Sequence, residues 1–337
     1  MLFADTDPTG PGRVAAANGG SEARAGDMCN IIVMQKDLAR DFVGYGRKPP
    51  NPNWPGKARI AVNFVANFEE GAEINVPDGD DYSEGTLTDA GGAGQELQDK
   101  KIRDLGAESM FEYGGRAGFW RIYNMFQRRN LPLTIFGCAL SLERNPEAAA
   151  AIREAGWDVC SHGWRFAKHY EMTESEERSQ IRKAIDSITK TTGKRPLGWY
   201  CRYTQGLNTR RLLVEEGGFL YDSNSYADDL PYWVDVGGKP HLVVPHTFSH
   251  NDDKFSRGWI NTAGEFFTYI KDAFDVLHRE GGQHPKFMTV SLHMRLSGHP
   301  ARSQGIERFL DYVAGQDGVW ICSRLELAQH WHKHHRP

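Results

Sequence analysis

The sequence predicts a single α/β domain, folded as a distorted or incomplete (β/α)7 barrel. Short apolar segments typical of strands alternate with segments that carry helix start signals over most of the chain. Repeated units of this kind form a parallel sheet, and seven or eight of them favour a closed or nearly closed barrel. Several strand segments also end in charged or imidazole side chains, at the position where α/β folds gather their ligands.

The first predicted strand lies within residues 59–71 and stops at the adjacent carboxylates Glu69 and Glu70. An almost wholly apolar run of β-branched and aromatic residues is typical of a parallel strand that is covered on both faces. The two carboxylates can simply cap the next element. A catalytic role is favoured only because other strands end in the same way.

Further strands are predicted at residues 133–137, 158–161, 197–200, 219–222, 242–245, 287–292 and 319–322. Capping boxes, in which a Thr or Ser precedes a Glu by three positions, predict helix starts at Thr173, Thr262 and Ser323. Asn208 is expected to cap a helix over residues 209–216, which the two glycines that follow would end. The alternation of these elements is what predicts the barrel.

Composition narrows the class of protein. The chain has 337 residues, of which 39% are hydrophobic and 25% charged, and its formal net charge is −4. The sequence has no basic stripe, so nucleic acid is not expected as a partner. No segment resembles a membrane span or a signal peptide. The five cysteines include no Cys-x-x-Cys pair, which favours reduced thiols and a cytoplasmic location.

Two segments depart from the alternating pattern. Residues 1–33 have almost no large apolar side chain and are predicted to be a disordered leader, with one catalytic domain over residues 34–337. The polar, Gly-rich insertion at residues 73–108 has no clear period. We expect it to lie near the barrel mouth or to form a subunit contact.

Three strand ends supply the groups that amide hydrolysis requires. Glu69 can act as the base that activates water, if burial or Glu70 raises its pKa toward neutrality. His162 can polarise the carbonyl or bind a metal, and His293 can protonate the leaving nitrogen. Each histidine taken alone is more often a hydrogen-bonded structural residue. It is the combination that predicts a catalytic site.

A series of motifs in one order makes the resemblance to a known family specific. They include residues 41–46, 54–60, 68–71, 112–118, 160–163, 198–200, 208–211, 215–223, 228–233, 292–293, 295–296, 300–302 and 330–332. With these motifs the chain resembles the polysaccharide deacetylase superfamily, and within it the metal-independent bacterial allantoinases of purine degradation. The resemblance covers about residues 38–335. It implies the incomplete barrel of the polysaccharide deacetylase type and a homo-oligomer.

The resemblance also bears on metal binding. Deacetylases of this superfamily bind a divalent metal through an aspartate and two histidines spaced His-x-x-x-His, whereas here Glu70 takes the place of the aspartate and Phe166 that of the second histidine. We therefore expect no metal and no other cofactor. The alternative is a zinc ion held by Glu70, His162 and His169.

The resemblance implies hydrolysis of a cyclic amide, with allantoin to allantoate as the first expectation and Glu69 as the base. The alternatives are a cyclic imide hydrolase with the same mechanism and a metal-dependent N-acetyl sugar deacetylase. The loops around the expected pocket depart from the allantoinase pattern, so the ring of the substrate stays open. Predicted substrate-binding residues are Glu70, Trp164, Trp199, Tyr200, Arg202, Asn224 and Arg295, and core packing is an equal alternative for Trp199 and Tyr200. Asp222 is a candidate to orient His293.

Overall fold

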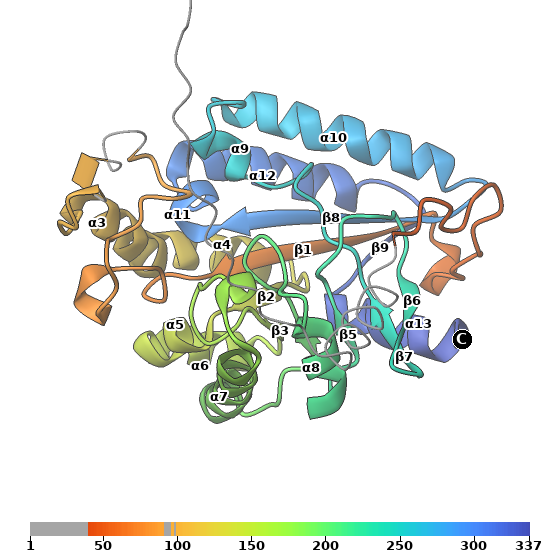
Figure 1. Ribbon diagram of the computed structural model, residues 1–337. Helices are drawn as coiled ribbons and strands as arrows, with labels where there is room; N and C mark the ends of the chain where they lie inside the picture. Colours follow the sequence, from red (N-terminus) through yellow and green to blue (C-terminus); the bar gives the residue numbers. More distant parts are fainter. Residues whose placement is uncertain (1–39, 91–95, 98) are drawn as a thin grey trace, which may run out of the picture. The chain divides into compact units, whose positions relative to one another are not determined.

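A curled sheet of nine strands organises the part of the chain that the computed structural model describes, which is residues 40–90, 96–97 and 99–337 (Figure 1). The strands are β1 (Ile60–Phe68), β2 (Thr134–Gly137), β3 (Asp158–Ser161), β4 (Gly198–Trp199), β5 (Tyr221–Asp222), β6 (Tyr232–Val236), β7 (Lys239–Val243), β8 (Lys286–His293) and β9 (Val319–Ile321). They lie in the order β6-β7-β5-β4-β3-β2-β1-β8, and β9 pairs with the start of β1. The pairing of β6 with β7 is antiparallel, and the other pairings are parallel.

The sheet curls into a half-barrel whose two edge strands, β6 and β8, do not pair with each other. The free edge of β8 pairs with no further strand. It forms only an isolated parallel bridge, between Ser291 of β8 and Asn251 in the segment after β7. The predicted incomplete barrel is therefore confirmed. The open side brings the segment that follows β7 alongside β8.

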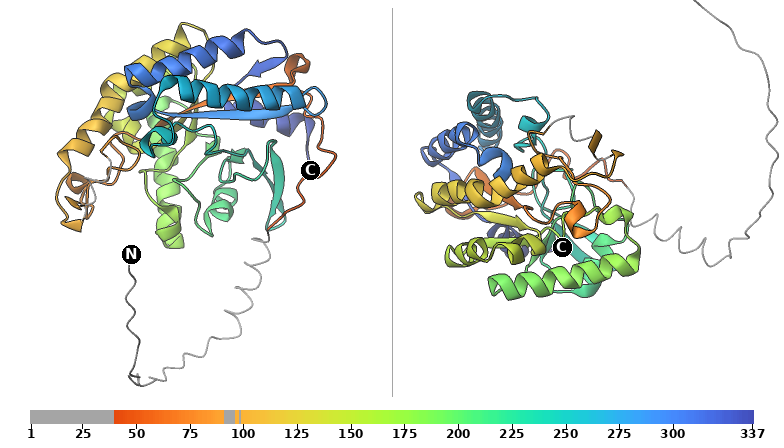
Figure 2. Two further views of the ribbon diagram at one scale, coloured as in Figure 1. Left: turned by 90° about the horizontal axis from the view of Figure 1, so that it is seen from above. Right: turned by 90° about the vertical axis from the view of Figure 1, so that its left-hand side faces the viewer.

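Helices pack around the sheet. They are α3 (Leu105–Tyr113), α4 (Phe119–Gln127), α5 (Ala139–Arg144), α6 (Pro146–Glu154), α7 (Glu174–Thr192), α8 (Thr209–Glu216), α9 (Asp253–Ser256), α10 (Ala263–Glu280), α11 (Met294–Ser297), α12 (Pro300–Ala314) and α13 (Arg324–His334). Helices α10 and α12 pack side by side over β1 and β8, and α5, α6 and α7 pack together beside β3 (Figures 1 and 2). A π-helical turn, Gly114–Gly118, joins α3 to α4.

Alternation along β1 explains how its two faces are buried. Ile60, Val62 and Phe64 face the outer helices, in the larger hydrophobic core. Ala61 and Val65 face the interior of the half-barrel, in a second core that α13 closes. Since both faces are covered, the almost wholly apolar sequence of this strand is accounted for.

Helix starts follow the sequence closely, with one exception. The three capping boxes at Thr173, Thr262 and Ser323 form as predicted. Helix α8 has the predicted bounds, but the side chain of Asn208 makes no capping hydrogen bond. Asn208 itself has helical backbone angles, which hold its side chain away from the amides that a cap would satisfy.

The hairpin of β6 and β7 was not predicted as a pair. Strand β6 was missed, and the strand expected at residues 242–245 begins earlier, at Lys239. The turn between them, Gly237-Gly238, has positive φ at both positions, as two-residue hairpin turns require. A Gly-Gly pair after an alternating segment was therefore a usable signal.

Residues 43–337 form one compact unit, and the predicted leader at residues 1–33 lies outside the described residues. Of the insertion at 73–108, the described residues include Leu87, which lies beside the cavity discussed below. Within the described ranges no helix combines the length and the apolar character that a bilayer crossing needs. The four cysteines described, Cys138, Cys160, Cys201 and Cys322, are buried free thiols.

Candidate active site

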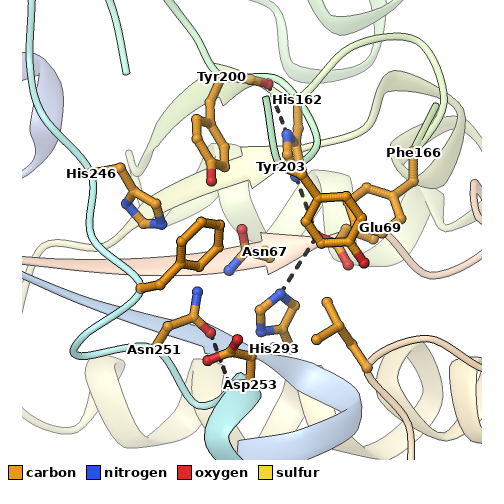
Figure 3. A pocket seen from close by; sticks show the side chains of 12 residues that line it. Asn67, Glu69, His162, Phe166, Tyr200, Tyr203, His246, Asn251, Asp253 and His293 are labelled. Atoms are coloured by element: carbon orange, nitrogen blue, oxygen red, sulfur yellow. Dashed lines mark hydrogen bonds and ion pairs between the residues drawn. The ribbon is translucent and has the colours of Figure 1, made fainter. Parts of the chain in front are cut away.

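Three side chains that are distant in the sequence meet at the carboxyl ends of their strands. Glu69 follows β1 directly, His162 follows β3, and His293 is the last residue of β8. All three line one cavity that is partly open to solvent (Figure 3). Parallel strands bring their carboxyl ends to one edge, which is why these residues converge.

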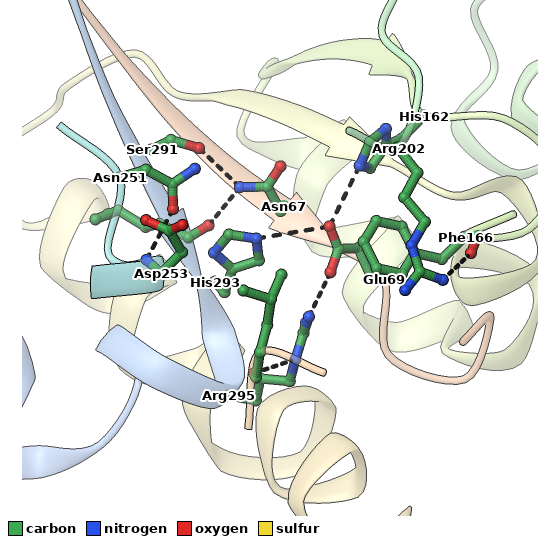
Figure 4. A network of polar contacts seen from close by, with 12 residues as sticks. Asn67, Glu69, His162, Phe166, Arg202, Asn251, Asp253, Ser291, His293 and Arg295 are labelled. Atoms are coloured by element: carbon green, nitrogen blue, oxygen red, sulfur yellow. Dashed lines mark hydrogen bonds and ion pairs between the residues drawn. The ribbon is translucent and has the colours of Figure 1, made fainter. Parts of the chain in front are cut away.

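The carboxylate of Glu69 is at the centre of the polar contacts (Figure 4). Its Oε1 lies 3.2 Å from Nε2 of His162 and 3.7 Å from Nε2 of His293. Its Oε2 accepts a hydrogen bond of 2.6 Å from the guanidinium of Arg295. A carboxylate in these surroundings is held in one orientation, with Oε1 on the side of the two imidazoles.

The protonation of the two carboxyl groups is the reverse of the sequence-based expectation. Burial alone would raise the pKa of Glu69, but the charges of Arg295 and His293, with the hydrogen bond from His162, outweigh it and hold the pKa well below its ordinary value. The expectation that burial or Glu70 raises this pKa toward neutrality is therefore wrong. It is the pKa of Glu70 that is raised, mainly by burial and further by Glu69, while Arg295 offsets only part of this.

Glu70 lies against the π-helical turn and not on the cavity wall. A Cβ atom on Gly114 would come within 2.5 Å of its Oε1, so the glycine-rich turn is shaped around this carboxyl. Glu70 Oε2 accepts from the backbone N–H of Glu69, and Oε1 accepts from Arg295 at 3.3 Å. Glu70 thus supports Glu69 and does not occupy the predicted substrate-binding position.

His293 is oriented by an aspartate that the sequence did not indicate. Its Nδ1 lies 2.6 Å from Oδ1 of Asp252, and its backbone N–H donates to Oδ2 of the same residue. Burial would lower the pKa of His293, but Glu69 and Asp252 together raise it above the ordinary value. A protonated imidazole that faces the cavity suits a general acid. The predicted partner, Asp222, is bonded instead to Arg210 and His241.

His162 is fixed by a backbone carbonyl. Its Nδ1 lies 2.8 Å from the carbonyl oxygen of Tyr200, which accepts, so Nδ1 carries a proton. The opposite nitrogen, Nε2, faces the ionised carboxylate of Glu69, which can only accept. The ring of His162 is therefore held between the backbone carbonyl of Tyr200 and the carboxylate of Glu69, beside the cavity.

Arg295 was predicted to bind substrate, but the structure gives it another position. It is 1% exposed, and its Nε donates to the carbonyl oxygen of Leu87 while its other nitrogens reach Glu69 and Glu70. Each of these hydrogen bonds goes to the protein, and Arg295 is not among the residues that line the cavity. It acts on the site through the charge that it places behind Glu69.

Four other predicted contacts lie elsewhere. Trp199 is fully buried in the larger core, and Trp164 packs on the edge of that core with Lys183 over its ring. Arg202 forms a buried ion pair with Glu84, and Asn224 accepts from the backbone N–H of Cys201. Of the predicted aromatic residues, Tyr200 does line the cavity.

The residues present do not form a divalent-metal site of the superfamily type. Both ring nitrogens of His162 are already engaged, and Phe166 presents a hydrocarbon ring to the cavity. His169, the alternative ligand, is bonded through Nδ1 to Glu177. Among the described residues, no three His, Cys, Asp or Glu side chains are arranged so that they could hold a metal ion. The positive charge next to the two carboxylates comes from Arg295.

Although the loops at residues 164–166, 201–207 and 249–252 were expected to line the pocket, several cavity residues were not among the site residues named from the sequence. They are Asn67, Leu87, Phe166, Tyr203, His246, Phe248, Asn251 and Asp253, with Asp252 behind His293. Most belong to loops whose conformation no periodicity predicts. A usable signal was the pair Asp252-Asp253 after the strand near residue 243, since other strands also end in carboxylates.

Comparison with known proteins identifies the family. A family model described as polysaccharide deacetylase matches residues 106–221. A putative polysaccharide deacetylase of Schizosaccharomyces pombe is 37% identical over 316 residues, which are 88% of this chain and 98% of that protein. The chain therefore belongs to the polysaccharide deacetylase family, as the sequence motifs indicated, and is an enzyme of the deacetylase and hydrolase superfamily.

Two solved structures are similar over nearly their whole length. A probable polysaccharide deacetylase from Pseudomonas aeruginosa PAO1 is 47% identical with a TM-score of 0.83, and the match covers 88% of this chain and 98% of that one. The structure of Puue allantoinase is 48% identical with a TM-score of 0.84 and the same coverage. The expected similarity to allantoinases is confirmed at the level of sequence and fold.

Proposed function

We propose that this protein is a hydrolase that opens a cyclic amide, with allantoin as the first candidate substrate and allantoate as the product. The observation that carries the proposal is the position of an ionised Glu69 between two histidines, next to Arg295 and not next to a set of metal ligands. The similarity to Puue allantoinase supports it.

The proposed reaction begins with water held at Glu69 Oε1. As the water oxygen bonds to the ring carbonyl carbon, one of its protons passes to Glu69 and the carbonyl electrons move onto oxygen. Glu69 is a weak base, but it is ionised at every pH near neutrality, and water becomes much more acidic as its oxygen bonds to carbon. Once Glu69 has taken this proton it is a poorer acceptor, and Nε2 of His162, 3.2 Å from Oε1, then donates to the oxyanion instead.

Ring opening requires a proton on the leaving nitrogen. When the tetrahedral intermediate collapses, the ring C–N bond breaks and the nitrogen takes a proton from Nε2 of His293. The raised pKa of His293 keeps this proton available at neutral pH. Return of the proton from Glu69 Oε1 to Nε2 of His293, 3.7 Å away, restores both groups. The sum of the steps is then the addition of one water across the amide, which gives a carboxylic acid and a free N–H.

A metal-dependent deacetylase acting on N-acetyl sugars is the second candidate, because the relative in Schizosaccharomyces pombe is named a putative polysaccharide deacetylase. A cyclic imide hydrolase would use the mechanism above with another ring. One screen separates the three: allantoin, hydantoins, cyclic imides and N-acetylglucosamine oligomers, each with and without a chelator. Release of acetate that depends on zinc would replace the proposal, whereas ring opening that resists the chelator supports it.

A further inference from the structure

Two buried polar side chains on the cavity wall have polar atoms without partners among the described residues. These atoms are both ring nitrogens of His246 and Oδ1 of Asp253, and each of the two residues is only 3% exposed. Both line the cavity and come from the segment after β7, residues 244–253 (Figure 3). Buried polar atoms without partners are uncommon because they destabilise the fold, so they indicate groups that a ligand completes.

His246 is a neutral hydrogen-bonding group. Burial lowers its pKa well below the ordinary value, and the positive charges of Arg324, His162, His293 and His250 lower it further. A neutral imidazole offers one donor and one acceptor. The rings of Phe136 and Tyr200 pack around it, with centroids at 5.4 Å and 4.8 Å, and hold it in place.

Asp253 offers a different kind of group. Its Oδ2 accepts from Nε of Arg257 at 2.8 Å, and its backbone N–H donates to Oδ1 of Asn251. These contacts fix the side chain and leave Oδ1 free. A carboxylate oxygen can only accept, so it favours N–H groups and disfavours the carbonyl groups of a ligand.

We propose that His246 and Asp253 determine which ring the cavity accepts, with Asp253 binding the N–H groups of a ureido-type substituent and His246 binding the polar edge of the ring. The inference rests on the proposed function for the reaction but concerns recognition. It specifies the substrate class as a compact ring with an N–H-rich substituent, such as the ureido-hydantoin allantoin. Plain hydantoin and cyclic imides lack the group that Asp253 would recognise.

Binding to Glu69→Gln, which should not turn over, tests this directly. Titration calorimetry would measure the affinity of Glu69→Gln for allantoin and for unsubstituted hydantoin. The same measurement would be made on the double variants that also carry Asp253→Asn or His246→Phe. Asp253→Asn should weaken allantoin binding about 10- to 100-fold, the range for a hydrogen bond to a charged group, and change hydantoin binding less than about 3-fold. His246→Phe should weaken both. Asp235→Asn, an exposed residue of β6, is the matched control and should change neither.

The wild-type background provides a second measurement that does not depend on the folding of Glu69→Gln. There, Asp253→Asn should lower the ratio of kcat/KM for allantoin to that for hydantoin about 10-fold or more. An unchanged ratio, or an equal loss of binding for both rings, would overturn the inference and leave the proposed function standing. Ring binding that responds to Asp253→Asn, with no turnover by the wild type, would remove the proposed function and retain the inference.

Discussion

The substitution Asp252→Asn tests the proposed acid most sharply. Asparagine has the same shape, and its oxygen can still accept from the backbone N–H groups of His293 and Ser297, as Asp252 Oδ2 does. Its amide nitrogen would then face Nδ1 of His293 with a donor in place of the present acceptor. The substitution therefore removes the negative charge next to His293. It also favours the neutral tautomer of His293 that carries its proton on Nε2 only.

The magnitude follows from the geometry of the pair. Nδ1 and Oδ1 are 2.6 Å apart in a fully buried site. An opposite charge at such a distance shifts a pKa by about 1–3 units, so its loss should lower the pKa of His293 by that amount. Glu69 still raises this pKa and Arg295 still lowers it. Since His293 must be protonated to act, the alkaline limb of the kcat profile should move to lower pH.

The assay is ring opening followed from about pH 5 to 10, with kcat and kcat/KM fitted separately. The wild type should lose activity only above the ordinary histidine range, because the pKa of His293 is raised. Asp252→Asn should lose it at lower pH and also fall about 10²- to 10⁴-fold at its optimum, the usual contribution of general acid catalysis. Asp222→Asn is the matched control, since Asp222 also faces a buried histidine, His241, away from the cavity. An alkaline limb that moves in Asp222→Asn and stays in place in Asp252→Asn would refute the assignment.

Three further results are expected. Glu69→Gln should abolish ring opening while circular dichroism shows a folded protein; measurable turnover would exclude Glu69 as the base. Dialysis against a chelator should leave kcat unchanged, because the described residues offer no metal-ligand set; activity that is lost and returns only with zinc would contradict this. Trp199→Ala should lower the free energy of unfolding by about 3–5 kcal/mol in urea denaturation, as for other fully buried aromatic residues, with no change in the ratio of kcat/KM between rings. A selective loss for one ring would restore its predicted role in binding.

The sequence was informative where a local pattern determines the outcome. Buried parallel strands give apolar runs, and capping boxes satisfy the first amides of a helix within four residues, so both could be predicted. The convergence of Glu69, His162 and His293 followed as well, because parallel strands bring their carboxyl ends to one edge. These predictions required no knowledge of loop conformation.

The partners of those residues could not be found in the same way. Asp252 and Asp222 are both acidic residues near strand ends, and only the path of the loop after β7 decides which one reaches His293. Aromatic residues raise the same difficulty, since Trp199 and Tyr200 are adjacent but alternate between the core and the cavity. Residues that position others depend on tertiary contacts that sequence spacing does not encode.

The position of Arg295 connects the chemistry of the site to its electrostatics. Two buried carboxyl groups on adjacent residues, such as Glu69 and Glu70, cannot both ionise without a neighbouring positive charge, because burial and mutual repulsion raise both pKa values. Arg295 reaches both, but its hydrogen bond to Glu69 is 2.6 Å and that to Glu70 is 3.3 Å. The shorter contact, together with His293 and His162 beside Glu69 alone, explains why the pKa of Glu69 is lowered while that of Glu70 stays raised. A divalent ion at Glu70 would have to compete with this fixed cation, so the same arginine that keeps the proposed base ionised also disfavours a metal beside it.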